Sequence, residues 1–125
     1  MLQSDFFTFS NIETSGFEIK AEVTINAAHT IFDGHFPGQP IVPGVCMMQM
    51  VKEIIEQVTS QKTSLIKSSE MKFLATIDPY KNNTISATLK YAINENNGLV
   101  VSAIFFKEEV VHFKLKGIFQ PLPKN

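Results

Sequence analysis

The chain has 125 residues, of which 44% are apolar and 18% are charged, and its 11 basic and 12 acidic residues give a formal net charge of −1. This balance lacks the basic excess typical of nucleic-acid binding, and no run approaches the roughly 18 consecutive apolar residues of a membrane span. We therefore expect one compact domain over residues 1–125, with neither nucleic acid nor a membrane as its partner.

The chain contains a single cysteine, Cys46, which cannot form a disulfide within the chain. A lone thiol is typical of a reducing compartment, and the first residues have neither the basic nor the apolar region of a signal peptide. The sequence therefore predicts a cytoplasmic protein whose core needs neither a disulfide nor a structural metal.

The N-terminal part predicts two strands. Apolar and polar residues alternate strictly over residues 17–25, which is the period of a half-buried strand. Residues 6–9 also favour a strand, and the polar residues and glycine of residues 11–16 predict a turn. An N-terminal antiparallel hairpin follows from this pattern.

A loop and a long helix come next. Over residues 26–44 the periodicity stops, and closely spaced glycines and prolines predict an ordered loop rather than a helix. Residues 45–60 contain neither glycine nor proline, so they predict a helix about 24 Å long. The first half of this helix is apolar almost all round, so we expect its N-terminal end to be sunk inside the protein, with Gln49 as the lone polar residue there.

The rest of the chain predicts strands separated by turns. The expected strands span residues 63–77, 84–93, 99–107 and 110–120, the last two as a hairpin with a very short turn. Only residues 121–125 are expected to be loose. The sum is an α+β fold, in which an antiparallel sheet of five or six strands wraps around one long helix.

One segment, residues 34–45, carries residues suited to chemistry. Its three prolines and three glycines restrict the backbone, so that His35 has a defined position relative to the helix start. Gly44 stands just before the helix, where free N–H groups of the first turn can stabilise a carbonyl oxygen that becomes negative. A histidine beside such a site can remove a proton α to a carbonyl.

The pattern His-Phe-Pro-Gly-x-Pro-x-x-Pro-Gly-Val, from His35 to Val45, resembles the signature of the β-hydroxyacyl-acyl carrier protein dehydratases (FabA/FabZ-like). Residues 26–32 resemble the short helical lead-in of that family. Residues 69–73, followed by Asp78 and Pro79, resemble its first strand after the central helix. The resemblance implies a single hotdog domain over residues 1–125, an antiparallel sheet wrapped around one long central helix.

The resemblance also implies roles for individual residues. His35 would remove the α-proton of a 3-hydroxyacyl thioester, and Gly44 would help to hold the thioester oxygen. The product would be a trans-2-enoyl thioester, with the substrate carried on the phosphopantetheine of an acyl carrier protein and with no metal or other cofactor. The expected substrate-binding residues are Phe36, Pro43, Val45 and Met48.

One position departs from the family pattern. The acid that protonates the leaving hydroxyl should stand at position 49, where this chain has Gln49. A glutamine amide cannot donate that proton, and loss of a general acid lowers the rate by about 10²- to 10⁴-fold. Glu53 lies one helical turn further, on the same face and about 6 Å along.

Three hypotheses follow from Gln49. In the first, Glu53 takes over as the acid and the chain is an active dehydratase, in a specialised fatty acid or polyene pathway. In the second, the chain is one half of a heterodimer whose other hotdog subunit supplies the acid. In the third, the tunnel only binds acyl chains or serves thioester hydrolysis. A hotdog protomer exposes an edge strand, so we expect at least a dimer, either a homodimer or a heterodimer.

Several other residues have simpler explanations. His29 and His112 are expected to be surface histidines or satisfied core histidines, and Cys46 is expected to be a core residue. Glu53 is equally compatible with a solvated position on the charged half of the helix. The lysines suit an acidic carrier protein, but scattered lysines are typical of an ordinary surface; they are Lys62, Lys67, Lys72, Lys81 and Lys90.

Overall fold

The computed structural model describes residues 5–34 and 41–123, and the side chains of residues 33 and 34 are not described. The described residues form six strands and two helices. In chain order these are β1 (Phe7–Ser15), β2 (Glu18–Ile25), α1 (Ile31–Gly34), α2 (Gly44–Thr59), β3 (Thr63–Phe73), β4 (Thr84–Ile93), β5 (Leu99–Lys107) and β6 (Val110–Pro121).

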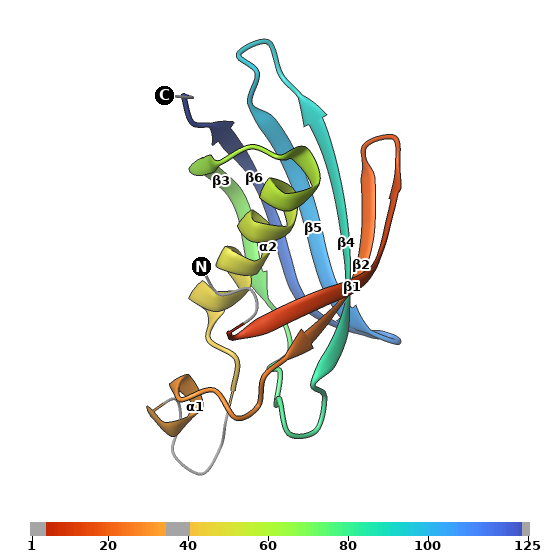
Figure 1. The fold of residues 1–125 in the computed structure, drawn as a ribbon, viewed down its shortest axis with the longest axis vertical. Helices are drawn as coiled ribbons and strands as arrows, with labels where there is room; N and C mark the ends of the chain where they lie inside the picture. Colours follow the sequence, from red (N-terminus) through yellow and green to blue (C-terminus); the bar gives the residue numbers. More distant parts are fainter. Residues whose placement is uncertain (1–4, 35–40, 124–125) are drawn as a thin grey trace.

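The six strands form one sheet in the order β1-β2-β4-β5-β6-β3, and every neighbouring pair is antiparallel. The sheet curves around α2, which lies against its concave face (Figure 1). Alternate residues along the strands are buried, as in the series Ile19, Ala21, Val23 and Ile25 of β2. The predicted α+β arrangement, with the sheet wrapped around one long helix, is confirmed.

Two strands that lie between clear turn residues begin and end where the sequence predicts. Strands β4 and β5 coincide with the predicted ranges, and Lys107 pairs with Val110 across a turn of only two residues. Strand β6 extends one residue beyond its predicted end, to Pro121, and the N–H of Leu122 donates to the carbonyl of Lys62 at 2.8 Å. The expectation of a loose tail from residue 121 is therefore wrong for its first two residues.

The predicted turn at residues 11–16 is wrong. Strand β1 continues to Ser15, which pairs with Glu18, so the turn lies only at residues 16 and 17. The register shifts between Ser10 and Glu13, where Asn11 adopts a left-handed conformation with φ of 52°. Asparagine tolerates this conformation, so the polar stretch forms a bulge within the strand instead of ending it.

Two further boundaries differ from the prediction. The expected loop over residues 26–44 contains α1, a single helical turn that follows a hydrogen bond from the N–H of His29 to the carbonyl of Asn26. Strand β3 ends at Phe73 rather than at residue 77, although Ile77 is fully buried. An apolar residue that is buried outside a strand gives the same sequence pattern as one inside a strand, because both are apolar and both lie in the core.

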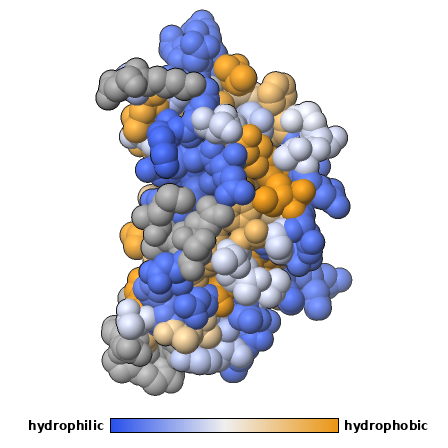
Figure 2. Space-filling model, viewed as in Figure 1, coloured by the Kyte–Doolittle hydropathy of each residue, from blue (hydrophilic) through white to orange (hydrophobic). Residues whose placement is uncertain are grey.

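Helix α2 does not bury its N-terminal half preferentially, so that prediction is wrong. Its buried side chains form a stripe along the length of the helix, whereas Val45 in the first turn is 71% exposed. Figure 2 shows hydrophilic residues over α2 and apolar residues between it and the β1–β2 side of the sheet. The stripe follows the spacing that points toward the sheet; its members are Cys46, Met47, Met50, Val51, Glu53, Ile54 and Ile55.

Candidate functional site at the start of α2

No side chain of the described residues caps the N-terminus of α2. Pro43 stands at the cap position with φ −64° and ψ 145°, and its carbonyl accepts from the N–H groups of Cys46 and Met47 at 3.0 and 3.3 Å. A proline side chain offers no oxygen to the first turn, so the N–H groups of Gly44 and Val45 have no acceptor within the helix. Two backbone donors at the positive end of the helix are therefore available to an anion or a polarised carbonyl.

A close aromatic contact explains why residue 44 is a glycine. A Cβ atom at Gly44 would lie 2.7 Å from Cε1 and 2.9 Å from Cζ of Phe73. The Phe73 ring packs on Phe113 at a centroid distance of 5.1 Å, and Phe113 packs on Phe105 at 5.7 Å. This aromatic series connects the start of the helix to the core of the sheet and leaves Phe73 itself 54% exposed.

The segment before the helix is held by the connection between β3 and β4. The N–H of Val42 donates to the carbonyl of Ile77 at 3.0 Å, and both residues are buried. Further along this connection, the N–H of Leu74 donates to the carbonyl of His112 at 2.9 Å, and His112 Nδ1 donates to the carbonyl of Ala75 at 3.0 Å. Strand β6 thus supports the connection that in turn supports the helix start.

The two polar candidates on α2 differ in burial. Gln49 is half-buried, whereas Glu53, one turn further, is 2% exposed. The interpretation of Glu53 as a solvated residue is therefore wrong. Of the predicted substrate-binding residues on or beside the helix, Pro43 is buried, Met48 is half-buried against the core and Val45 is exposed.

The predicted base lies outside the described residues. His35 belongs to residues 35–40, and so does the predicted substrate-binding residue Phe36. The structure thus brings Gly44 and Pro43 together at the helix start and places Gln49 and Glu53 along the same helix, while the roles of His35 and Phe36 stay predictions.

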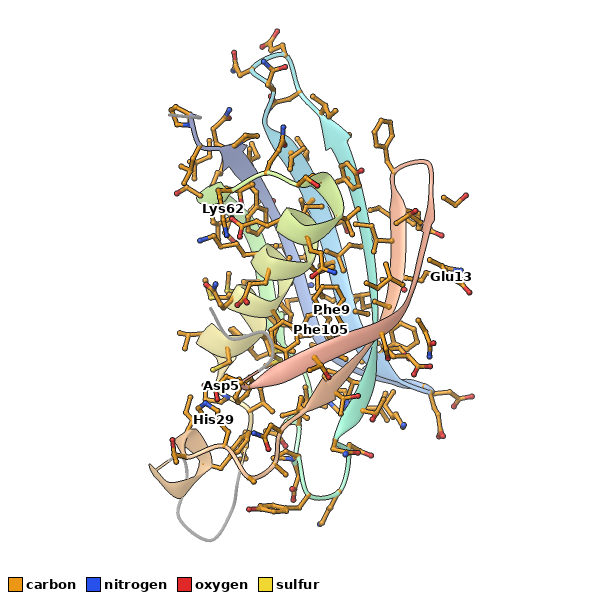
Figure 3. The ribbon with its side chains drawn as sticks, viewed as in Figure 1. Asp5, Phe9, Glu13, His29, Lys62 and Phe105 are labelled. Carbon is orange, nitrogen blue, oxygen red and sulfur yellow. The ribbon has the colours of Figure 1, made fainter. Side chains whose placement is uncertain are left out.

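The other two histidines have structural partners. His29 Nδ1 accepts from the N–H of Ile31 at 3.0 Å, and its Nε2 donates to a carboxylate oxygen of Asp5 at 3.1 Å, so both ring nitrogens are satisfied (Figure 3). His112 is a core histidine, one of the two expected positions, but it is not the satisfied one expected there, because its Nε2 has no hydrogen-bond partner among the described residues. His112 is therefore a core histidine that is only half satisfied.

The thiol, the potential metal ligands and the helices of the described residues bear on other kinds of function. Burial raises the pKa of the Cys46 thiol, which keeps it in the unreactive protonated form expected of a core cysteine. Within residues 5–34 and 41–123, no group of three or more histidine, cysteine, aspartate or glutamate side chains is placed to hold a metal ion. In the same part of the chain no helix is long and apolar enough to cross a membrane.

Sequence reasoning missed Phe73 as part of the site. It lies in the stretch that resembles the family strand, but its neighbour Gly44 is far away in sequence. The available signal was a glycine, Gly44, at the start of a helix, because a residue without a side chain at such a position is consistent with close approach of another group to the backbone. The uncapped N–H groups and the Phe73 ring can together bind a carbonyl oxygen beside an apolar chain, and the buried carboxylate of Glu53 lies further along the same helix.

Comparison with known families gives one match over most of the chain. A family model for ApeI-like dehydratases matches residues 11–113, which include α2 and the segment before it.

Curated relatives match either most of the chain at low identity or about half of it at higher identity. The chain is 26% identical over 108 residues to the 3-hydroxyacyl-[acyl-carrier-protein] dehydratase FabZ of Blochmanniella pennsylvanica, which covers 86% of this chain and 66% of that protein. It is 38% identical over 60 residues to the enzyme of the same name from Mannheimia succiniciproducens, covering 48% of this chain and 39% of the relative. The matched region thus spans less than two thirds of the length of these relatives.

Solved structures share the fold. A chain of the dehydratase heterocomplex ApeI:P from Xenorhabdus doucetiae superposes with a TM-score of 0.76 at 18% identity, covering 90% of this chain and 96% of that one. The putative thioesterase yhdA from Lactococcus lactis superposes with a TM-score of 0.65 at 13% identity, covering 100% and 98%. These likenesses confirm the predicted hotdog fold.

Proposed function

The chain belongs to the ApeI-like dehydratase family, and from that premise we propose that it eliminates water from a 3-hydroxyacyl thioester to give a trans-2-enoyl thioester. The observation that carries the proposal is the start of α2, where the N–H groups of Gly44 and Val45 lack a cap and the Phe73 ring stands beside them. A thioester oxygen that gains negative charge suits this combination of backbone donors and an apolar wall.

The proposed reaction has two proton transfers, one from the α-carbon and one to the leaving hydroxide, and different residues carry them out. His35 takes the α-proton, and the charge that develops on the thioester oxygen is stabilised by the N–H of Gly44. The electron pair then forms the α,β double bond as the bond from the β-carbon to the hydroxyl breaks. A proton delivered to the leaving hydroxide completes a molecule of water.

We assign that second proton to Glu53, directly or through one water molecule. Glu53 is buried on the same helix as the uncapped N-terminus, one turn beyond Gln49, and glutamate is among the side chains that act as general acids. Gln49, one turn closer to the helix start, can hydrogen-bond the β-hydroxyl through its amide but cannot protonate it.

The proposed substrate is carried on the phosphopantetheine of an acyl carrier protein, and the chemistry needs no metal or other cofactor. Phe36, Pro43, Val45 and Met48 are proposed to contact the acyl chain. The surface lysines, among them Lys67 and Lys72, are the candidates for contact with an acidic carrier. We further propose a cytoplasmic protein with one hotdog domain, which works as a dimer in a specialised fatty acid or polyene pathway.

The test is hydration of a crotonyl thioester, the reverse of the proposed reaction, by the purified protein. We expect turnover by the natural chain and a loss of about 10²- to 10⁴-fold in the His35→Ala variant, because the base is removed. Equal rates in the two proteins would overturn the assignment of His35.

A second candidate function is favoured by Gln49. With an amide in place of the acid, the chain is alternatively an acyl-binding subunit that is active only beside another hotdog chain, or a thioesterase. No turnover by the chain alone, but turnover after co-expression with a second hotdog protein, is the result expected of the subunit. Release of free thiol without hydration is the result expected of the thioesterase.

A further inference from the structure

His112 stands at an irregular point of β6. The register of β5 with β6 shifts between Phe105 and Phe106, where β6 has one residue more, so His112 is a β-bulge. In a regular strand neighbouring side chains point to opposite faces of the sheet, but His112 and Phe113 are both buried, at 3% and 0% exposure. The bulge therefore turns two adjacent side chains of β6 into the interior of the protein.

Three hydrogen bonds join His112 to the connection between β3 and β4. Its carbonyl accepts from the N–H groups of Leu74 and Ala75, at 2.9 and 3.4 Å. Its side chain adds the third bond, with Nδ1 at 3.0 Å from the carbonyl oxygen of Ala75. A carbonyl oxygen can only accept, so Nδ1 carries the hydrogen and donates it. Ala75 is thus bound to one residue through both its N–H and its C=O.

The same connection binds the segment before α2. The carbonyl of Ile77 accepts from the N–H of Val42 at 3.0 Å, and Val42 lies two residues before Gly44, the first residue of the helix. Residues 74–77 follow the end of β3 and belong to no helix or strand of the described chain. The bonds to His112 therefore fix their backbone where a strand ladder does not.

The residue after His112 supports the same point of the helix by another route. The Phe113 ring packs on Phe73 at a centroid distance of 5.1 Å, and Phe73 stands over Gly44. Two adjacent residues of β6 thus reach the start of α2, one through ring contacts and the other through hydrogen bonds. The second route needs an N–H donor at one atom, Nδ1 of His112.

We propose that His112 is a positioning residue for the start of α2. Its Nδ1–H group holds Ala75, and the connection that follows holds Val42 and, through it, the uncapped N–H groups of the first turn. Nε2 has no partner among the described residues, which is unfavourable for a buried polar atom, so the donor at Nδ1 is the property of histidine that this position uses. The consequence for turnover rests on the proposed function, whereas the consequence for Val42 does not.

Amide hydrogen exchange tests the positioning without any reaction. In the full chain carrying His112→Ala, the N–H of Val42 should exchange about 3- to 10-fold faster than in the natural chain, because a supporting hydrogen bond is lost. Glu56→Ala, which acts at the other end of α2, is the matched control. It should accelerate the exchange of Ala103, in the middle of the sheet, through its effect on overall stability, but it should leave Val42 unchanged.

Two conservative variants separate the two ring nitrogens. The amide nitrogen of asparagine stands as many bonds from Cα as Nδ1, and that of glutamine as many as Nε2. We expect His112→Asn to restore slow exchange at Val42 and His112→Gln to behave like His112→Ala. Thermal unfolding of each variant checks that all are folded at the temperature of measurement.

Hydration of a crotonyl thioester tests the consequence for turnover. We expect kcat to fall by about 10- to 100-fold in His112→Ala and His112→Gln with little change in KM, because displaced backbone donors stabilise the transition state less. His112→Asn should keep a kcat close to that of the natural chain. A merely structural role would lower stability in all three variants without this division between asparagine and glutamine.

Several results would overturn the proposal. Unchanged exchange of Val42 in His112→Ala, or equal acceleration in His112→Ala and Glu56→Ala, would show that His112 does not hold this segment. Rescue by glutamine but not by asparagine would assign the role to Nε2. Faster exchange of Val42 with unchanged kcat would refute the effect on turnover alone. A natural chain without turnover would refute the proposed function alone, because the exchange of Val42 still reports the positioning.

Discussion

The two ends of α2 are built in opposite ways. At the N-terminal end no side chain caps the first turn, Val45 is exposed and Phe73 crowds the backbone of Gly44. At the C-terminal end Ser60 adopts a left-handed conformation and its N–H donates to the carbonyl of Glu56. The Glu56 carboxylate also accepts from the N–H and the hydroxyl of Thr63, at 2.6 and 3.2 Å.

The two ends of α2 therefore serve different purposes, stability at the C-terminal end and ligand binding at the N-terminal end. The C-terminal end satisfies its polar groups with atoms of the chain itself, which stabilises the fold. The N-terminal end keeps backbone donors unused by side chains, and these are what a ligand with a developing negative charge requires. Substitutions at the C-terminal end should therefore change the free energy of unfolding, whereas substitutions toward the N-terminal end should change turnover.

The largest expected effect is that of Glu53→Gln. This change keeps the shape of the side chain but removes the proton, so kcat for a 3-hydroxyacyl thioester should fall by about 10²- to 10⁴-fold. Steady-state kinetics of the dehydration provide the measurement. Glu56→Gln, one turn further along the helix, is the matched control and should keep its kcat; a Glu53→Gln variant with unchanged kcat would remove Glu53 from the mechanism.

Gly44→Ala should have the next largest effect. The added methyl group would lie 2.7 Å from the Phe73 ring, so the ring or the helix start must shift, at a cost of about 1 to 3 kcal/mol. Turnover and thermal stability should both decrease. Combining Gly44→Ala with Phe73→Ala removes the collision. If stability recovers but turnover does not, the Phe73 ring itself is needed for turnover. If stability does not recover, the collision with Phe73 is not the cause of the lost stability.

Glu56→Ala should lower stability alone. It leaves the buried Thr63 without its carboxylate acceptor, and an unsatisfied buried donor costs about 1 to 3 kcal/mol. Chemical denaturation should show the decrease in the free energy of unfolding, while kcat stays unchanged. A large fall in kcat at unchanged stability would contradict the division between the two ends.

The smallest effect is expected from Ser60→Gly. Ser60 has a φ of 58°, a left-handed conformation that glycine adopts without the strain caused by a Cβ atom. The free energy of unfolding should rise by about 0.5 to 1 kcal/mol, measured by the same denaturation experiment. Gly16→Ala, at a turn position with φ of 59°, provides the reverse comparison and should lower stability.

Local patterns explain which elements could be predicted. Strands β4 and β5 lie between turn residues, with asparagines before each strand, Gly98 next to β5 and two glutamates after it, so local signals give their bounds. Asn11 and Ile77 give misleading signals. Asn11 is a polar residue inside a strand, at a bulge, and therefore looks like a turn, whereas Ile77 is a buried apolar residue outside a strand and therefore looks like part of one. The position of Gly44 at the start of α2 can be predicted because a helix start is a local feature.

What the sequence determines by itself is the local and periodic part of this protein: the long helix, the alternating strands, the proline- and glycine-rich segment with His35, and the family that this segment indicates. Only the tertiary structure decides that Glu53 is buried, that Phe73 stands over Gly44 and that His112 keeps one ring nitrogen without a partner among the described residues. The physical reason is that burial and contact depend on which distant segments meet, and a helix face becomes inside or outside only when the sheet closes around it.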